Sequence, residues 1–288
     1  MLLASYNIQF GRGRDGQFDL ARIAGELAAA DLIALQEVER YWQRSGMVDQ
    51  PAELARLLHM PHWVYGPGVD LHLQAAPGGA AAGARRQFGN MLLARTPLLF
   101  ARNHLLPKFA STGPLSLQRC ALEAAVMTAA GAIRVYSVHL THLSAQTRAP
   151  QVQRLLQIHR DACLEGSPIA CGAMSQEWVD EALPLPMPRD AVIMGDFNME
   201  PDSAEYAAMV GPISPYGGRL NNPEGLVDTW VSNGHREGDG VTATVHGRPA
   251  RLDYCFASTA LAARVLAARI DADAQGSDHQ PIWVEMEL

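Results

Sequence analysis

The sequence predicts an α/β protein whose β-sheets contain both parallel and antiparallel strands. In the first 60 residues, short apolar runs typical of strands, at residues 2–8 and 32–35, alternate with amphipathic helix patterns. In the second half, strand-like runs follow one another in pairs without an intervening helix. A doubly wound parallel sheet needs a crossover helix between successive strands. The paired runs therefore favour mixed sheets.

The first elements have recognisable start signals. Residues 2–8 form a strand that ends near Asn7, and a turn rich in glycine follows. Asp19 can cap a helix whose apolar residues recur at helical spacing, namely Leu20, Ile23, Ala24, Leu27 and Ala28. Pro51 marks the start of a second helix that carries Leu54, Leu57 and Leu58 on one face. Residues 75–84, rich in Ala, Gly and Pro, are expected to form a surface loop.

The second half contains more strands than helices. A helix over residues 146–162 is expected to direct Val152, Leu155, Leu156 and His159 inward. Asp202 and Glu205 have the spacing of a capping box for a helix over Ala204–Val210. Residues 171–188 are expected to form a long loop or an insertion. The remaining strands are predicted at residues 90–94, 121–127, 133–140, 191–195, 251–257 and 281–288.

Composition and charge exclude several classes of protein. Apolar residues make up 48% of the 288 residues and charged residues 18%, which excludes a disordered chain. The net charge of −7 argues against a strongly basic nucleic-acid-binding protein. It leaves room for a local basic groove, or for an acidic cleft whose charge bound metal cancels. The length alone suggests two domains at roughly 150 residues each.

Cysteine usage and the lack of long apolar runs predict a cytoplasmic protein. The four cysteines form no Cys-x-x-Cys pair, and free thiols in a reducing compartment are expected. No run approaches the roughly 18 apolar residues of a membrane span. The N-terminus lacks the basic and apolar regions of a signal peptide.

Polar residues that can bind metal or move protons follow the predicted strands. Each alone has a structural explanation as a turn, cap or core residue, but their shared position at strand ends makes coincidence unconvincing. Carboxylate and amide oxygens suit Mg²⁺ or Mn²⁺. The pair His139-x-x-His142 could bind zinc, but no helix brings the two rings together, so zinc is disfavoured. The residues at strand ends are Asn7, Glu37, His139, Asp196, Asn198, Asp278 and His279.

A series of motifs over residues 5–281 resembles that of the endonuclease/exonuclease/phosphatase superfamily. Gln36-Glu37, Gly195-Asp196-Phe197-Asn198 and Ser277-Asp278-His279 are the most specific of these motifs. The order of the motifs along the chain also matches that group. The others are Ser5-Tyr6-Asn7-Ile8, Gly89-Asn90, Ser137-Val138-His139-Leu140 and Arg251-Leu252-Asp253-Tyr254.

The resemblance implies a four-layer α/β/β/α sandwich of two mixed β-sheets flanked by helices. It implies one catalytic domain over residues 1–288, with room for a loop insertion at residues 165–190. It also implies Mg²⁺- or Mn²⁺-dependent hydrolysis of phosphate esters by metal-assisted attack of water.

Roles follow from the resemblance residue by residue. Glu37 is the main metal ligand beside Asn7, and Asp278 is a ligand for a second metal position. Asp196 orients or deprotonates the attacking water, and Asn198 holds a phosphate oxygen or places Asp196. His279 stabilises the transferring phosphoryl group with Asp253 behind it, while His139 contacts the phosphate and can protonate the leaving oxygen. Arg12, Asn90, Arg119 and His142 are expected substrate contacts; the alternatives are a solvated loop, a turn asparagine, a surface salt bridge and an exposed loop histidine.

The motifs indicate the reaction class and leave the substrate open. His139 occupies a position where abasic-site endonucleases carry a different motif, which favours the histidine-containing branch. The leading prediction is a phosphodiesterase or phosphatase. The alternatives are a DNA or RNA nuclease using the same site, and a catalytically silent binding module of the same fold. The expected partner is a phosphate-ester substrate, with no obligate protein partner and no membrane-spanning segment.

Overall fold

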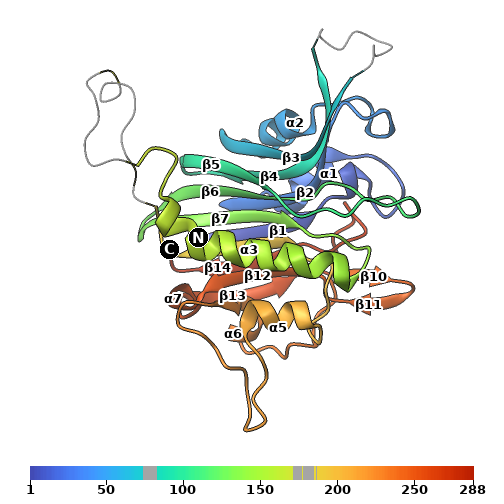
Figure 1. Cartoon of the computed structure of the whole chain (residues 1–288). Coiled ribbons are helices and arrows are strands. Elements are labelled where there is room, and N and C mark those ends of the chain that lie inside the picture. The colour runs from blue at the N-terminus through green and yellow to red at the C-terminus, as the bar shows by residue number, and fades with distance from the viewer. Residues whose placement is uncertain (74–82, 171–176, 178–184, 186) are drawn as a thin grey trace.

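Two six-stranded β-sheets pack face to face in the computed structural model (Figure 1). The structure describes residues 1–73, 83–170, 177, 185 and 187–288. In spatial order, the first sheet contains β13 (Val265–Ile270), β14 (Ile282–Met286), β1 (Leu2–Asn7), β2 (Leu32–Arg40), β4 (Arg85–Ala94) and β3 (His62–His72). The second contains β5 (Leu98–Leu105), β6 (Cys120–Thr128), β7 (Gly131–His139), β8 (Ala191–Asp196), β12 (Asp253–Ser258) and β9 (Leu226–Asp228).

Each sheet has one parallel pair at its centre, while its other neighbours run antiparallel. β1 pairs in parallel with β2, and β7 pairs in parallel with β8. A small hairpin of β10 (Ala243–Val245) and β11 (Arg248–Ala250) stands apart from both sheets. The prediction of an α/β sandwich of two mixed sheets is therefore confirmed.

Helices cover the outer face of each sheet and complete the four layers. α1 (Leu20–Leu27) and α2 (Gln50–Leu58) pack on the first sheet, and α3 (Ala145–Glu165) and α5 (Ala204–Val210) pack on the second. Figure 1 shows α3 lying across its sheet, with α1 and α2 on the far side of the molecule. The short helices α6 (Thr229–Ser232) and α7 (Thr259–Ala262) pack beside β12.

Alternation along the strands separates three cores. In β2, Leu32 and Ala34 lie between the two sheets, while Ile33 and Leu35 face α1 and α2. Because successive strand residues point to opposite faces, each central strand supplies side chains to both its sheet interface and a helix interface. This explains why these strands appear in the sequence as continuous apolar runs.

The predicted start signals are confirmed for α1 and α2, and the one predicted for α5 is wrong. The Asp19 carboxylate accepts a hydrogen bond from the Arg22 amide at 3.0 Å, and Pro51 lies in the first turn of α2. α5 is capped by Ser203, whose hydroxyl accepts from the Tyr206 amide at 3.2 Å. The predicted capping box of Asp202 and Glu205 is therefore wrong.

The strands that were not predicted include the outer strands β3, β5 and β13. β3 contains the Gly66-Pro67-Gly68 sequence and is largely half-exposed, and β5 alternates between exposed and half-buried residues. Edge strands bury less apolar surface than central strands, so their sequence patterns are weaker. The expected loops at residues 75–84 and 171–188 lie mostly outside the described residues.

Two further predictions concern membrane spans and thiols. In the described part of the chain, no helix is long and apolar enough to cross a membrane. Cys120, Cys163 and Cys255 are free thiols. The fourth cysteine, Cys171, lies outside the described residues.

A buried carboxylate in β6 holds a network of donors together. Glu123 is fully buried and accepts hydrogen bonds from Arg102 Nε at 2.7 Å, His104 Nε2 at 2.8 Å and the Tyr136 hydroxyl at 2.7 Å. Burial alone would raise the pKa of Glu123, but the bonds from His104, Arg102 and Tyr136 outweigh it and lower the pKa to about 2.

The Glu123 network should make stability fall in acid. Between the ordinary carboxyl pKa of 4.5 and the native value near 2, the unfolded chain binds the proton more readily than the folded chain. The network's contribution, about 3 kcal/mol at neutral pH, should therefore be lost as pH falls from 5 to 2. Urea unfolding should show a large deficit for Glu123→Gln at pH 6 that shrinks toward pH 2.5. Glu165→Gln, which removes only the half-exposed partner of Arg102, is the matched control. A deficit that does not change with pH would contradict this assignment.

Candidate active site

Four central strand ends meet at one edge of the sandwich. β1 ends at Asn7, β7 ends at His139 and β8 ends at Asp196. β12 runs the opposite way, so its first residue, Asp253, lies at the same edge. The register pairs Asp196 with His139 on one side and with Asp253 on the other. Paired residues project to the same face of a sheet, so these three side chains form one row.

This row points into the space between the two sheets. Val192 and Met194 lie in the inter-sheet core, and Asp196 follows them at the same alternation. His139 likewise follows Val135 and Ser137. The candidate site is thus the polar continuation of the inter-sheet core at the strand ends.

Glu37 reaches the same space because β2 is irregular at this residue. Its φ is +60°, and the pairing of β2 with β4 shifts between Leu35 and Val38. A bulge adds one residue and redirects the side chains beyond it. Gln36 already faces the other sheet, where its amide donates to the Ser137 hydroxyl at 3.0 Å. The bulge brings Glu37 to the same side, where its carboxylate accepts from Asn7 Nδ2 at 3.4 Å.

Asp196 lies at the centre of the cluster. It is 1% exposed, and its carboxylate accepts from Asn7 Nδ2 at 3.0 Å and from the Asn198 amide at 2.9 Å. Burial, with the nearby Asp253 charge, raises the pKa of Asp196 to about 7. Asn198 has a left-handed φ of +50°, and its side chain donates to the Leu140 carbonyl at 3.1 Å. Asn198 therefore holds the turn that carries Asp196.

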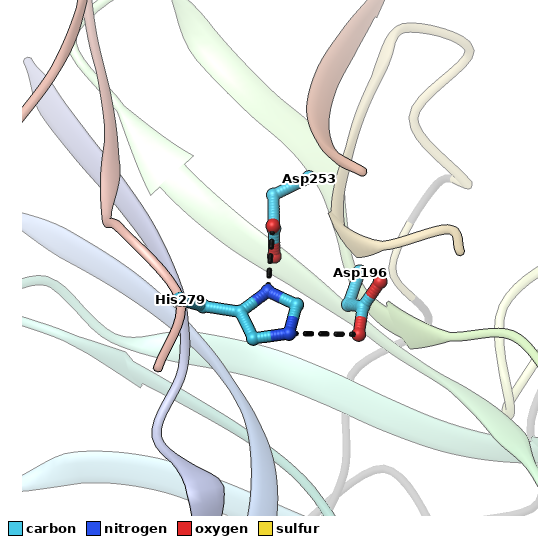
Figure 2. Close-up of side chains that lie close together, drawn as sticks. All are labelled: Asp196, Asp253 and His279. Atoms are coloured by element: carbon cyan, nitrogen blue, oxygen red, sulfur yellow. Dashed lines mark hydrogen bonds and ion pairs between the residues drawn. The ribbon is translucent and has the colours of Figure 1, made fainter. Parts of the chain in front are cut away.

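His279 lies between two carboxylates, as Figure 2 shows. Its Nδ1 is 2.8 Å from Asp253 Oδ2, and its Nε2 is 3.8 Å from Asp196 Oδ2. Burial alone would lower the pKa of His279, but Asp253 and Asp196 outweigh it and raise the pKa to about 10. The ring is therefore a cation at neutral pH.

His139 has the opposite electrostatic setting. Its Nδ1 is 2.9 Å from Arg119 Nη1, and its Nε2 is 3.3 Å from Asp196 Oδ2. Burial, together with the Arg119 charge, lowers the pKa of His139 well below its usual range. The two histidines beside Asp196 therefore differ in charge.

Comparison with known proteins identifies the family. The model of the endonuclease/exonuclease/phosphatase family matches residues 4–279. The chain belongs to this family. A search of curated proteins gave no match. As the family name states, its members include nucleases and phosphatases, which are hydrolases of phosphate esters.

Solved structures of the family share the fold. An endonuclease/exonuclease/phosphatase from Beutenbergia cavernae is 22% identical, with a TM-score of 0.67; the match covers 100% of this chain and 71% of that one. A mannosyl-6-phosphatase from Bacteroides thetaiotaomicron is 15% identical with a TM-score of 0.58 and full coverage of both chains. Truncated TDP2 from Caenorhabditis elegans is 15% identical, with a TM-score of 0.59; the match covers 98% of this chain and 95% of that one. At these identities the likeness shows the fold alone.

Three further residues that were predicted to belong to the site, Asp278, Arg12 and His142, are exposed at the surface. Asp278 is exposed, and its carboxylate accepts from Gln9 Nε2 at 2.7 Å. Its charge helps to raise the pKa of Glu37, after the larger effect of burial. Arg12 is exposed on the loop after β1, and His142 is exposed after β7.

Two of the predicted substrate contacts, Asn90 and Arg119, are buried and hydrogen-bonded within the protein. Asn90 is 2% exposed, and its side-chain nitrogen donates to the Cys120 carbonyl at 2.9 Å and the Ser137 carbonyl at 3.0 Å. These bonds join the two sheets and occupy both amide hydrogens, so Asn90 has no donor left for substrate. Arg119 is 5% exposed, which excludes the alternative of a surface salt bridge. Its contacts are with His139 and His142.

Several residues that support the site were not predicted. The buried Thr242 hydroxyl accepts from the backbone amides of Leu252 at 2.9 Å and Asp253 at 3.1 Å. Thr242 precedes the β10–β11 hairpin and carries no sequence signal for this role. The Ser277 hydroxyl donates to the Asn7 carbonyl at 2.6 Å and accepts from the His279 amide at 3.2 Å. The position of Ser277 in the Ser-Asp-His motif is the sequence signal that could have identified this supporting role.

The donor set fits a hard divalent cation. Glu37 is desolvated enough for burial to raise its pKa, yet its hydrogen-bond donor among the described residues is a 3.4 Å contact from Asn7. Glu37 is half-buried, and the Arg119 and His279 charges oppose the effect of burial on its pKa; its carboxylate oxygens are of the type that Mg²⁺ or Mn²⁺ prefers. Asn7 turns its amide nitrogen to Glu37 and Asp196, and its oxygen accepts from the Gln9 amide at 3.1 Å. Asn7 would therefore have to turn its amide to bind metal through oxygen.

A second group of ligand-type atoms has a different chemistry. Atoms of Asp196, Asp253 and His279 lie within 4.8 Å of one another. An imidazolium has no free lone pair for a metal. The protonated His279 between two carboxylates therefore suits proton handling and charge stabilisation better than metal binding.

Proposed function

We propose that the protein is an Mg²⁺- or Mn²⁺-dependent hydrolase of phosphate esters. The observation that carries this proposal is the meeting of Asp196, His279 and Glu37 in one space between the sheets, with His279 cationic and Asp196 titrating near neutral pH. A base is most effective when its pKa lies near the working pH. One catalytic domain over residues 1–288 remains part of the proposal, because Asn7 and His279 both contribute to the site.

In this mechanism Asp196 orients the attacking water and accepts its proton. Asn7 and Asn198 hold the two carboxylate oxygens of Asp196, so the base has a fixed direction. His279 faces the negative charge that develops on the phosphoryl oxygens, and Asp253 keeps the ring oriented and protonated. Glu37 would hold the cation, with Asn7 and Asp278 beside it, and a bound cation would polarise a phosphoryl oxygen.

The charge balance of the chain favours a small substrate over a long polyanion. A nucleic-acid strand needs uncompensated positive charge along its path. The chain carries 23 Lys and Arg residues against 30 Asp and Glu residues, and several arginines are paired with carboxylates, among them Arg219 with Glu237 and Arg251 with Asp228. We therefore favour a phosphodiester or phosphomonoester of limited length over DNA or RNA.

Removal of divalent metal should abolish hydrolysis. Bis(p-nitrophenyl) phosphate and p-nitrophenyl phosphate, assayed with Mg²⁺ or Mn²⁺, should release nitrophenol, and excess EDTA should reduce the rate to background. Glu37→Gln should lose the metal response, whereas Glu285→Gln, which changes an exposed carboxylate on β14, should keep it. Turnover that survives exhaustive chelation would reject the metal-dependent mechanism.

A substrate panel separates the remaining alternatives. Plasmid DNA, single-stranded RNA, a phosphoinositide and sphingomyelin should each be incubated with protein and Mg²⁺. Cleavage of the nucleic acids at rates above those of the small esters would favour a nuclease. No turnover of any member, with the fold intact, would favour the silent binding module.

A further inference from the structure

Arg119 is a buried arginine whose guanidinium hydrogen-bonds to two histidines among the described residues, with the Glu37 and Asp196 carboxylates close enough to act on its charge. It precedes β6, is 5% exposed, and places Nη1 2.9 Å from His139 Nδ1 and Nη2 3.4 Å from His142 Nδ1. A guanidinium can only donate hydrogen bonds. Both Nδ1 atoms must therefore be acceptors, and neither can carry a proton while the contact lasts.

We propose that Arg119 is a positioning residue that fixes His139 as a neutral imidazole with its proton on Nε2. A neutral imidazole whose Nδ1 accepts must carry its hydrogen on Nε2. The Nε2 of His139 is 3.3 Å from Asp196 Oδ2, so the ring donates toward the carboxylate that we propose as the base. This inference rests on the proposed function for its catalytic meaning, but the tautomer follows from the contacts alone.

The charges around His139 agree with the hydrogen-bond geometry. Four charged or titratable groups face the ring: Arg119, Asp196, His142 and His279. Asp196 is the acidic group of this set, and its carboxylate is shared with Asn7 and with the His279 cation. The positive charges of Arg119 and His279 therefore disfavour a third positive charge on the His139 ring, and burial disfavours it as well.

The consequence is a division of roles between two histidines that both direct Nε2 at Asp196. His279 is backed by the Asp253 carboxylate and is the cation, while His139 is backed by a guanidinium and is the neutral donor. His139 can therefore give the leaving oxygen a hydrogen bond. It is not set up to give that oxygen a proton, so the expectation that His139 acts as an acid is revised.

Nitrogen NMR of the full chain tests the assignment directly. With ¹⁵N-labelled histidine, the two ring nitrogens of His139 should show the neutral Nε2–H pattern at every pH between 5.5 and 8, and loss of the signals in His139→Gln identifies them. Arg119→Lys should keep this pattern, because an ammonium also donates to Nδ1 and cannot accept. In Arg119→Met, His139 should titrate within this range or populate both tautomers.

Activity measurements give a second readout. Arg119→Met should lower kcat on bis(p-nitrophenyl) phosphate by about 10- to 100-fold, as expected for a misplaced donor, and Arg119→Lys should restore most of that loss. His142→Gln removes the other partner of Arg119 and should leave the His139 tautomer unchanged. If Arg119→Met does not fold, the wild-type and Arg119→Lys spectra still decide the matter.

The proposal fails if wild-type His139 carries its proton on Nδ1, or if it becomes doubly protonated between pH 5.5 and 8. It also fails if a folded Arg119→Met protein keeps the wild-type spectrum. The NMR spectra can be recorded on a protein without activity, so failure of the Arg119 proposal can be told apart from failure of the proposed hydrolase function. A locked His139 in a protein inactive on every phosphate ester would reject the proposed hydrolase, whereas an active protein with a titrating His139 would reject only the role of Arg119.

Discussion

Replacing Asp196 with asparagine should lower kcat for phosphate-ester hydrolysis by at least about 10²-fold, the size expected for loss of a general base. Asparagine has nearly the same volume and can still accept from the Asn198 amide, so the turn after β8 should survive. What disappears is the group that can take a proton from water. Burial raises the pKa of Asp196 to about 7, which suits a group that accepts a proton near neutral pH.

The measurement is steady-state hydrolysis of bis(p-nitrophenyl) phosphate with saturating Mg²⁺, with circular dichroism to verify folding. Asp70→Asn is the matched control, because it removes an exposed carboxylate whose ion-pair partner among the described residues is Arg85 on the neighbouring strand. Its kcat should equal that of the wild type. Near-normal turnover in Asp196→Asn would show that another group activates the water.

Replacing His279 with alanine should also lower kcat by at least about 10²-fold, through loss of an electrostatic stabiliser of the transferring phosphoryl group. The variant leaves Asp253 and Asp196 facing each other without the cation between them. Breaking such a buried pair costs about 3–5 kcal/mol of stability. A fall in Tm should therefore accompany the loss of activity.

His279→Gln separates catalysis from stability, since its amide can still donate to Asp253 while the positive charge is absent. We expect this variant to recover part of the lost Tm with little recovery of kcat. His72→Ala, a change to an exposed ring at the end of β3, should alter neither quantity. Full activity in a folded His279→Gln protein would mean that the charge on His279 does not contribute to catalysis.

The sequence allowed the edge of the sandwich that holds the site to be predicted because the central strands have a simple pattern. Apolar residues run to the last inward position, and a polar residue follows, as at Asp196 after Val192 and Met194. Such a pattern needs only the two-residue period of a strand. The family motifs then supplied the order of Asn7, Glu37 and His279 along the chain.

Asn90 shows why pattern alone misplaces some residues. The Gly-Asn sequence resembles a strand start, but β4 begins at Arg85 and runs for 10 residues, so Asn90 lies in its interior. The earlier residues of β4 pair with the edge strand β3 and are only partly buried, which hides the beginning of β4 in the sequence. Strand ends are the positions that sequence patterns locate least well.

The contact between Arg119 and His139 could not be predicted for another reason. The two residues are 20 positions apart, and they meet because β6 pairs with β7 in a register that sets Ala121 opposite Val138. Register depends on how both strands bury their apolar faces against the rest of the molecule. A search for motifs along the chain does not contain that information.

The bulge at Glu37 makes one short stretch of β2 unusually sensitive to insertion and deletion. It sets two consecutive residues, Gln36 and Glu37, on the same side of the sheet, and Val38 then returns to the helix side. Deleting either residue would remove the bulge and restore regular alternation, so the rest of β2 would keep its faces but only one of the two inward side chains would remain. Family sequences should therefore align without gaps between Leu35 and Val38, even where nearby loops differ in length.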